Sequence, residues 1–308
     1  MTLPFLTHPH GKLLLTAEYA VLDGALALAL PTRFGQSLAV VEGGASGELR
    51  WQSLDHTGRP WFEGVFVLPH LALKHSSEER TGRALEQVLQ TAKSLGTDPL
   101  PGMGLALTAR LDFPRDWGLG SSSTLIAAVA RWFGVDPFQL LADTFGGSGY
   151  DVACAYAPGP ILYQISGEQA VITPAAFDPP FRDNLFLVHL GQKQDSRAGI
   201  RYYREQLTDT SALVRDLSEI TEAILECADQ ETFEALLLEH EHRLAEALNL
   251  PRAQRLYFEG FPGVVKSLGA WGGDFVLATS PWPEGETRAW FQARGFASVL
   301  GWRDMFFS

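Results

Sequence analysis

Apolar residues in the first third of the chain occur mostly as short runs or in alternation with polar residues, a pattern typical of β-strands. In residues 10–41 the apolar runs are interrupted at Asp23-Gly24 and at Pro31-Thr32, which predicts strands joined by tight turns. Further strands are predicted within residues 47–68 and at 103–111, 161–165 and 184–190.

An apolar residue at every third or fourth position marks the segments that we expect to be helices. These are residues 81–95, 125–133, 135–145, 211–227 and 231–248, together with one helix through Tyr203. The helix at 135–145 begins at Asp136-Pro137, where proline suits the first helical position. Residues 262–302 mix helix and strand. The predicted elements are thus strands first, helices later and then a mixture of both. This order along the chain predicts an α+β fold with two lobes.

Length and composition are those of an ordinary soluble globular protein, with 308 residues, of which 46% are apolar and 19% charged. This length exceeds one typical domain and is enough for a large core. The proline-rich stretch at residues 174–180 is the best candidate for a boundary. We therefore expect an N-terminal domain at 1–170 and a C-terminal domain at 171–308.

The charge and the cysteines limit the classes of function. A net charge of 24 − 36 = −12 argues against nucleic acid or an anionic membrane as a partner, so we expect a small-molecule substrate. Two cysteines, Cys154 and Cys227, provide neither a disulfide framework nor a C-x-x-C metal site. No basic and apolar leader opens the sequence and no apolar run is long enough to span a bilayer, so we expect a cytoplasmic protein.

The most informative stretch, residues 114–128, reads P-R-D-W-G-L-G-S-S-S-T-L-I-A-A. Gly118 and Gly120 permit backbone angles and close approach that a Cβ would prevent. Residues 121–124 supply hydroxyl groups at a helix start, where unpaired backbone N–H groups attract anions such as phosphate. A single serine would suffice to cap a helix after a glycine turn, so the dense run favours a loop that binds phosphate. It is not of the Walker type, because no G-K-[ST] follows.

This stretch resembles the central motif of the GHMP kinases (galactokinase, homoserine kinase, mevalonate kinase and phosphomevalonate kinase), commonly P-x-x-x-G-L-G-S-S-A. The resemblance implies that the loop wraps the phosphates of ATP and that Ser122 helps to hold Mg²⁺. The residues implied to bind ATP here are Gly118, Leu119, Gly120, Ser121, Ser122, Ser123 and Thr124.

The first strong strand resembles the first motif of the same family, commonly A-P-G-K-x-x-x-x-G-E-x-x-V. In mevalonate kinases the lysine lies beside the reacting hydroxyl and a glutamate follows six residues later; Lys12 and Glu18 have this spacing. On an unbroken strand the two residues would lie about 20 Å apart. Any cooperation between them therefore requires a turn near Thr16-Ala17, where alanine replaces the usual glycine. The resemblance makes Lys12 catalytic and Glu18 a contact of the substrate.

The run F-G-G-S-G-Y-D-V-A-C-A, residues 145–155, resembles the S-G-x-D segment in which mevalonate-type kinases place their catalytic aspartate. The resemblance makes Asp151 the base that accepts the proton of the acceptor hydroxyl. The alternative is that Asp151 only caps residues 152–155. Related kinases carry an acidic Mg²⁺ ligand shortly upstream; Asp143 is the only nearby acid, at an offset that does not match.

Two later stretches complete the resemblance. The sequence K-S-L-G-A-W-G-G-D-F-V-L-A, residues 266–278, is similar to the C-terminal motif K-x-T-G-x-G-x-G-G, which implies a loop closing over phosphates. Its aligned glycines are Gly269, Gly272 and Gly273. The stretch H-L-G-Q-K-Q-D-S-R, residues 189–197, is similar to a segment of mevalonate and phosphomevalonate kinases at the head of a helix. Its residues that could hold a substrate carboxylate or phosphate are Lys193, Ser196 and Arg197.

Motifs in family order imply the GHMP kinase fold, an N-terminal α+β lobe and a ferredoxin-like C-terminal lobe with ATP between them. They imply an ATP- and Mg²⁺-dependent small-molecule kinase, a monomer or homodimer, with mevalonate as the first candidate for acceptor and phosphomevalonate as the next. Two alternatives stay open at this point. One is the related diphosphomevalonate decarboxylase, and the other is a ligand-binding homologue without catalysis.

Overall fold

The computed structural model describes residues 3–96, 104–167, 169–192, 196–269, 271 and 273–307. These residues form two compact units built from alternating segments of the chain. The first unit comprises Met1–Gly11, Phe34–Arg115 and Leu119–Tyr156, and the second comprises Lys12–Arg33, Asp116–Gly118 and Ala157–Ser308. The sequence predicted a single boundary at residue 170. The units interleave instead, because segments distant in sequence pair in one sheet, which a shift in composition does not reveal.

The first unit contains a sheet in the order β6-β5-β4-β7-β3-β1. The pair β4–β7 is parallel and the other pairs are antiparallel. The strands are β1 (Phe5–Thr7), the second half of β3 (Ala27–Glu42), β4 (Glu48–Leu54), β5 (Pro60–Val67), β6 (Ala72–Ser76) and β7 (Leu105–Leu111). These strands lie in segments where the sequence predicted strand, except β1 and β6, which it did not predict.

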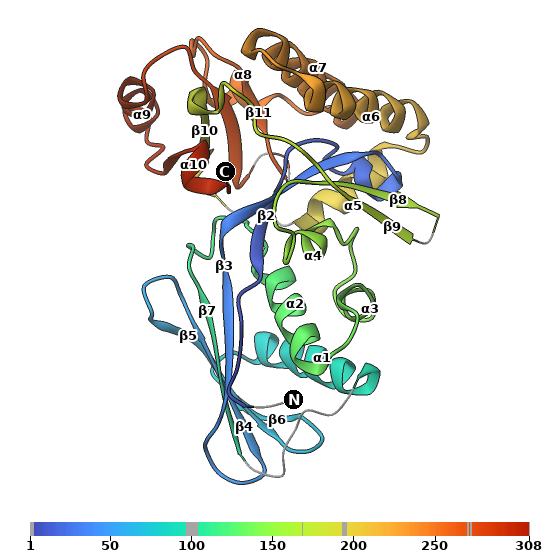
Figure 1. Ribbon diagram of the computed structural model, residues 1–308, viewed down its shortest axis with the longest axis vertical. Helices are drawn as coiled ribbons and strands as arrows, with labels where there is room; N and C mark the ends of the chain where they lie inside the picture. Colours follow the sequence, from blue (N-terminus) through green and yellow to red (C-terminus); the bar gives the residue numbers. More distant parts are fainter. Residues whose placement is uncertain are drawn as a thin grey trace. The chain divides into compact units, whose positions relative to one another are not determined.

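Helices cover one face of this sheet (Figure 1). They are α1 (Glu79–Leu95), α2 (Ser121–Phe133), α3 (Pro137–Ala142) and α4 (Tyr150–Cys154). Helix α1 begins where the Glu78 carboxylate accepts hydrogen bonds from two backbone N–H groups, and α3 begins at Asp136, as its sequence predicts. The apolar face of α1, with Leu85, Val88 and Leu89, packs into the core between helices and sheet.

The second unit contains a four-stranded antiparallel sheet in the order β11-β12-β10-β13. Its strands are β10 (Leu185–His189), β11 (Val265–Ser267), β12 (Phe275–Thr279) and β13 (Val299–Gly301). Helices α5 (Ser196–Gln206), α6 (Ser211–Glu226), α7 (Gln230–Leu248) and α8 (Ala253–Tyr257) separate β10 from β11, and α9 (Glu284–Gln292) separates β12 from β13. This is the β-α-β-β-α-β order of a ferredoxin-like arrangement, so that prediction is confirmed.

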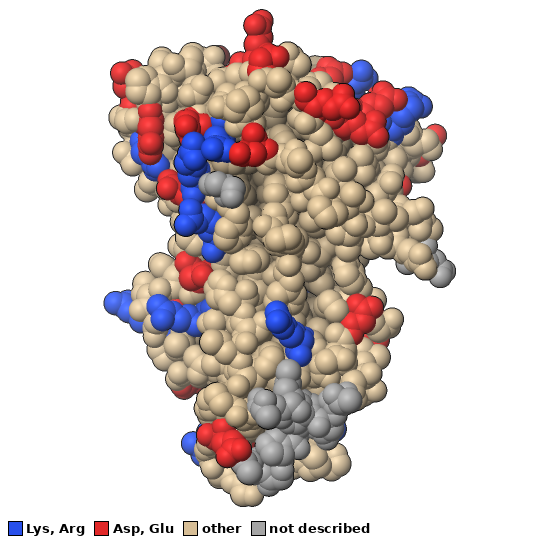
Figure 2. Space-filling view, viewed as in Figure 1, with Lys and Arg blue, Asp and Glu red and all other residues tan. Residues whose placement is uncertain are grey.

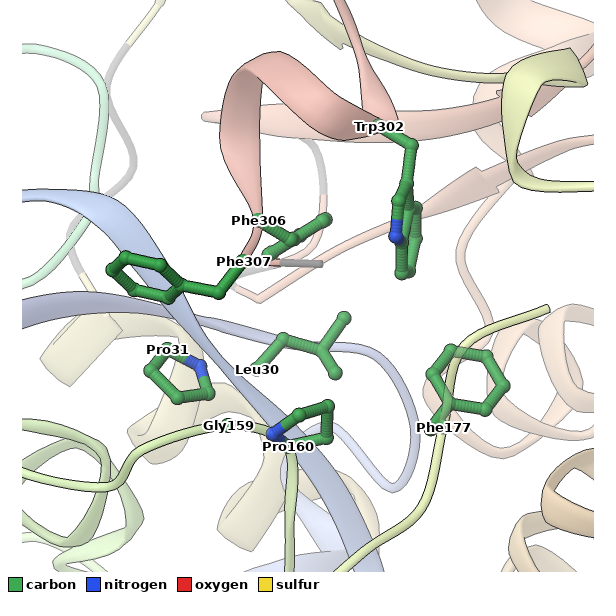
Figure 3. Close-up of a pocket in the computed structure, with 8 residues that line it drawn as sticks. All are labelled: Leu30, Pro31, Gly159, Pro160, Phe177, Trp302, Phe306 and Phe307. Carbon is green, nitrogen blue, oxygen red and sulfur yellow. The ribbon is translucent and has the colours of Figure 1, made fainter.

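The remaining elements of the second unit precede or flank this sheet. They are the end of β2 (His10–Leu14), η1 (Ala20–Asp23), the first half of β3, the hairpin β8 (Ile161–Ser166) and β9 (Gln169–Pro174), η2 (Arg182–Asn184) and α10 (Trp302–Met305). A small apolar pocket lies where Leu30 of β3 and Phe177 face Trp302 of α10 (Figure 3). No helix in the described part of the chain is both long and apolar enough to cross a membrane.

Strand β3 differs from its prediction, because Pro31-Thr32 does not end it. The strand continues from Ala27 to Glu42. Strand β3 pairs with β2 as well as with β7 and β8. Residues 27–29 pair with β8 and residues 36–42 pair with β7, so Pro31 lies outside these two ladders. A proline has no N–H to donate, and at this position the missing N–H removes no hydrogen bond from the ladders with β7 and β8.

Charged side chains on the face shown in Figure 2 are mostly interspersed, with Lys and Arg beside Asp and Glu. In the second unit, Arg303 pairs with Asp183 at 2.7 Å and Arg243 pairs with Asp216 at 3.6 Å. Exposed pairs of this kind contribute little to stability, typically below about 1 kcal/mol. Stability therefore depends mainly on the packing of buried apolar side chains.

Two glycines give a matched test of the packing. A Cβ at Gly35 would lie 2.3 Å from the carbonyl oxygen of Pro9, whereas a Cβ at Gly285 in α9 would have no neighbour within 4 Å among the described residues. We expect Gly35→Ala to lower the free energy of unfolding by about 1–3 kcal/mol, because the neighbour is backbone. We expect Gly285→Ala to raise it by about 0.4–1 kcal/mol. Urea unfolding measures both, and wild-type stability in Gly35→Ala would contradict the described packing.

Candidate active site

The glycine–serine loop, residues 118–124, leads into α2 in the first unit. Gly120 has a left-handed backbone (φ +91°) and precedes the first residue of α2. The Ser123 hydroxyl donates to the Gly120 carbonyl at 2.9 Å, and the Thr124 hydroxyl donates to Gln36 Oε1 at 2.8 Å. The hydroxyls of Ser121 and Ser122 form no hydrogen bond with any part of the chain that the structure describes. These two hydroxyls and the N–H groups of the first turn are therefore the groups that can meet an anion.

The residues just before this helix belong to the second unit, where several contacts hold them. Gly118 has φ +66°, and a Cβ there would lie 2.2 Å from the Asp274 carboxyl carbon, so only glycine fits. The Lys12 ammonium donates to the Gly118 carbonyl at 3.0 Å. His189 Nε2 lies 3.1 Å from the Asp116 carbonyl and donates to it. The start of the loop is thus fixed by side chains of the second unit.

The turn that the sequence required between Lys12 and Glu18 is present. Ala17 has φ +62° and Tyr19 has φ +61°, both in the left-handed region that non-glycine residues rarely adopt. The Ala17 N–H donates to Nε2 of His240 at 2.8 Å, and the Tyr19 hydroxyl accepts the Trp271 N–H at 2.8 Å. These hydrogen bonds hold a backbone conformation that costs about 1–3 kcal/mol at each such residue.

Glu18 lies between these two strained residues and is only 2% exposed. Its Oε1 accepts a hydrogen bond from the ammonium of Lys266 at 2.5 Å, and Lys266 is fully buried. The Lys266 ammonium also donates to the Ser267 carbonyl at 2.9 Å, while Ser267 donates through its hydroxyl and its N–H to the Glu241 carboxylate. Glu18 therefore has a structural role in the second unit, and its contact with the substrate stays a prediction.

Burial sets the protonation of this cluster. Desolvation raises the pKa of the Glu18 carboxyl to about 7, although the charge of Lys266 acts in the opposite direction. Desolvation also raises the pKa of Glu241, against the charge of Lys266. Desolvation and the charge of Lys266 both hold the pKa of His240 well below its usual value, so this imidazole is neutral and its Nε2 can accept the Ala17 N–H. One lysine thus faces two carboxyl groups at the centre of the second unit.

Helix α4 begins directly after Gly149, which has φ +87°, and Asp151 lies in its first turn. Its carboxylate accepts the N–H of Val152 at 3.0 Å and is half-buried. The N-cap of α4 is Gly149 and α4 has no side-chain cap hydrogen bond, so this contact with the adjacent residue does not establish the capping role that the sequence left as an alternative. A carboxylate has a second oxygen, so the contact with Val152 is compatible with the catalytic role that the resemblance implies.

Asp143 does not fit a metal ligand. It is exposed at the end of α3 and accepts a hydrogen bond from Gln139 at 2.9 Å, four residues earlier on the same helix. No group of three or more His, Cys, Asp or Glu side chains within the described residues could hold a metal ion.

The other predicted residues lie in different environments. Lys193 and Gly272 lie outside the described residues. Ser196 and Arg197 are exposed in the first turn of α5. Gly269 has φ +66° with open space where a Cβ would stand, and Gly273 is buried directly before Asp274. Leu119 is completely buried.

Sequence reasoning missed His240 and Glu241. Helix α7 buries residues spaced by three or four, from Phe233 and Leu237 to Leu244 and Leu248, and the His-Glu pair lies on the same buried face. Two ionisable residues on the apolar face of an amphipathic helix are a signal that the sequence contains. It indicates a buried polar cluster, although its partners Glu18 and Lys266 are too distant in sequence to identify.

The raised pKa of Glu18 predicts how stability changes with pH. A carboxyl whose pKa rises from about 4.5 to about 7 on folding stabilises the fold below pH 4.5 and loses that contribution as the pH rises through 7. The lowered pKa of His240 changes the pH dependence of stability in the opposite direction. The stability of wild type must therefore be compared with that of a variant in which only Glu18 is changed. We expect the stability of wild type relative to Glu18→Gln, from urea unfolding, to fall between pH 5 and pH 8. A constant difference would contradict the raised pKa.

No protein-family model and no curated protein sequence matches the chain. Solved structures do match it over almost the whole length. L. major mevalonate kinase in complex with R-mevalonate is similar with a TM-score of 0.68 and 16% identity, covering 98% of each chain. Streptococcus pneumoniae phosphomevalonate kinase in complex with phosphomevalonate and AMPPNP is similar with a TM-score of 0.66 and 17% identity, covering 96% of this chain and 98% of that one.

Lactococcus lactis galactokinase complexed with galactose is similar with a TM-score of 0.69 and 12% identity, covering 96% of this chain and 92% of that one. These proteins act on different acceptors, so the likeness identifies the fold and leaves the acceptor open. The chain has the fold of the GHMP kinases.

Proposed function

We propose that this protein is an ATP-dependent small-molecule kinase. The observation that carries the proposal is the glycine–serine loop, where left-handed glycines precede a helix start with two hydroxyls that the described protein leaves unbonded. Such a helix start offers N–H groups and a favourable dipole to an anion, and a triphosphate is the anion that a kinase must hold. The similarity to the AMPPNP-bound phosphomevalonate kinase supports ATP as that ligand.

The acceptor that we propose is a mevalonate-type hydroxy acid, which would make the protein mevalonate kinase-like. The sequence motif around Lys12 and the segment leading into α5 are nearest to the mevalonate branch, and R-mevalonate is bound in one of the similar structures. Phosphomevalonate is the second candidate, supported by the second similar structure. Exposed Arg197 could pair with the acceptor's carboxylate or phosphate in either case.

Mg²⁺ fits this site as an ion held jointly by a protein hydroxyl and the phosphates of the substrate. Magnesium is commonly held by one or two protein groups together with water and the substrate phosphates, and it needs no cage of protein ligands. Ser122, exposed in the first turn of α2, is the residue that we expect to contact it. When bound, the ion neutralises negative charge on the phosphates.

The proposed chemistry is transfer of a phosphoryl group to a hydroxyl oxygen. The oxygen of the acceptor forms a bond to the γ-phosphorus of ATP while the bond from that phosphorus to the β–γ bridging oxygen breaks and ADP leaves. The proton of the acceptor hydroxyl moves to the Asp151 carboxylate. Lys12 has two roles in this proposal. It fixes the Gly118 carbonyl, as the described hydrogen bond shows, and it places a positive charge near the start of the phosphate loop.

An assay over a panel of acceptors tests the proposal. We expect calorimetric titration to show ATP binding, and we expect ADP release with mevalonate or phosphomevalonate that exceeds the release with galactose. Release of carbon dioxide from diphosphomevalonate would favour the decarboxylase. ATP binding without turnover of any acceptor would favour a homologue without catalysis, and absence of ATP binding would overturn the proposal itself.

Substitution of Asp151 distinguishes a base from a cap. Asp151→Asn keeps an oxygen for the Val152 N–H but removes proton affinity, so kcat should fall by about 10²–10⁴-fold while the melting temperature barely changes. Asp143→Asn is the matched control, an exposed acid for which we expect unchanged kcat.

Wild-type kcat in Asp151→Asn would leave Asp151 with the capping role alone. A loose transition state needs little help from a base, and in that case Lys12→Met should be the more damaging change. Normal turnover in both variants would remove the two residues from the mechanism.

A further inference from the structure

Tyr19 is the residue at which three separate segments of the second unit meet. Its backbone belongs to the strained turn after Lys12, its hydroxyl contacts the loop after β11, and its ring stacks on Tyr203 of α5. The two rings lie 5.7 Å apart between centroids, with planes 17° apart. The side chain is only 9% exposed, so both contacts lie within the packed interior.

On the side of the loop, the Tyr19 hydroxyl accepts the backbone N–H of Trp271 at 2.8 Å. The indole N–H of Trp271 donates to the Pro251 carbonyl at 3.1 Å, so this residue is held by both backbone and ring. Gly269, two residues before Trp271, has a left-handed backbone (φ +66°). Loss of the hydroxyl would leave the Trp271 N–H without this acceptor.

On the side of the helix, α5 approaches Tyr19 closely. A Cβ at Gly199 would lie 2.6 Å from the Tyr19 hydroxyl oxygen. Gly199 is in the first turn of α5, three residues after Ser196. Tyr203, one turn later, is fully buried and donates its hydroxyl to Asp23 at 2.5 Å. A shift of the first turn of α5 therefore presses on the atom that holds Trp271.

We propose that Tyr19 is a positioning residue that couples the first turn of α5 to the loop after β11. This inference rests on the proposed function, in which the first turn of α5 meets the acceptor, and on the family resemblance of residues 266–278, which implies that the loop after β11 closes over the phosphates of ATP. Binding of the acceptor and binding of ATP then depend on each other through one hydroxyl group. By linkage, each ligand strengthens the other by the same factor.

The coupling can be measured without any ligand, from hydrogen exchange of the Trp271 amide. Gly199→Ala places a methyl group against the Tyr19 hydroxyl, so exchange at Trp271 should accelerate. Tyr19→Phe removes the acceptor, so exchange should accelerate there too, and adding Gly199→Ala should then change little more. Tyr203→Phe is the matched control, since it removes a hydroxyl of the same ring stack but leaves the Trp271 contact in place.

Unchanged Trp271 exchange in Gly199→Ala would overturn the coupling, as would equal acceleration by Gly199→Ala with and without Tyr19→Phe. Tyr19→Phe tests the contact on its own if Gly199→Ala folds poorly, and unchanged exchange in this variant would also overturn the inference.

A second arm of the experiment uses ATP–Mg²⁺ and mevalonate as probes. In wild type, saturating mevalonate should tighten ATP binding, and Tyr19→Phe should remove that effect and weaken ATP binding by about 2- to 10-fold, the loss expected for one neutral hydrogen bond. KM for ATP should rise by more than kcat falls, while Tyr203→Phe keeps the wild-type values. If wild type binds no ATP, the proposed function fails, and the exchange data still decide the coupling. If wild type binds ATP and Tyr19→Phe keeps both the wild-type affinity for ATP and the wild-type tightening by mevalonate, the inference fails alone.

Discussion

The buried ion pair between Glu18 and Lys266 is the interaction on which the second unit depends. The ammonium is fully buried and the carboxylate is 2% exposed, so each charge lies out of reach of water. Removing one partner of such a pair typically costs about 3–5 kcal/mol, because the other charge is left uncompensated. The pair joins the turn after β2 to strand β11, two segments separated by more than two hundred residues. A dry, directional contact of this kind fixes their relative position more tightly than apolar packing can.

The same contact explains how a strained turn persists without glycine. Ala17 and Tyr19 both have positive φ, and each is held by a hydrogen bond, to His240 and from Trp271 respectively. Glu18, between them, is held by Lys266. Three consecutive residues are thus fixed by three different partners, so the strain is distributed over contacts that form together. Neutral His240 is part of this balance, because a protonated imidazole could not accept the Ala17 N–H.

The sequence contained much of the fold because local patterns determine most of its elements. Alternation located β7, and the three-to-four period located α1, α6 and α7. The need for a turn near Thr16-Ala17 followed from the reach of a strand, and the turn is there. Local patterns do not show which strands or side chains pair when they are distant in sequence. Neither the interleaved units nor the pair Glu18–Lys266 could therefore be predicted. The polar pair His240-Glu241 was visible on an apolar helix face, but its partners were not.

The glycine–serine loop also belongs to both compact units, and this division bears on what it can do. Asp116 and Gly118 are held by His189 and Lys12 in the second unit, whereas Ser123 and Thr124 are bonded within the first. The left-handed Gly118 and Gly120 flank the point at which the chain passes from one unit to the other. These hydrogen bonds hold the residues at both ends of the loop. The residues between them keep N–H groups and two hydroxyls that a ligand can contact. In the proposed function, a phosphate meets backbone that these contacts have already positioned, which reduces the entropy that binding must overcome.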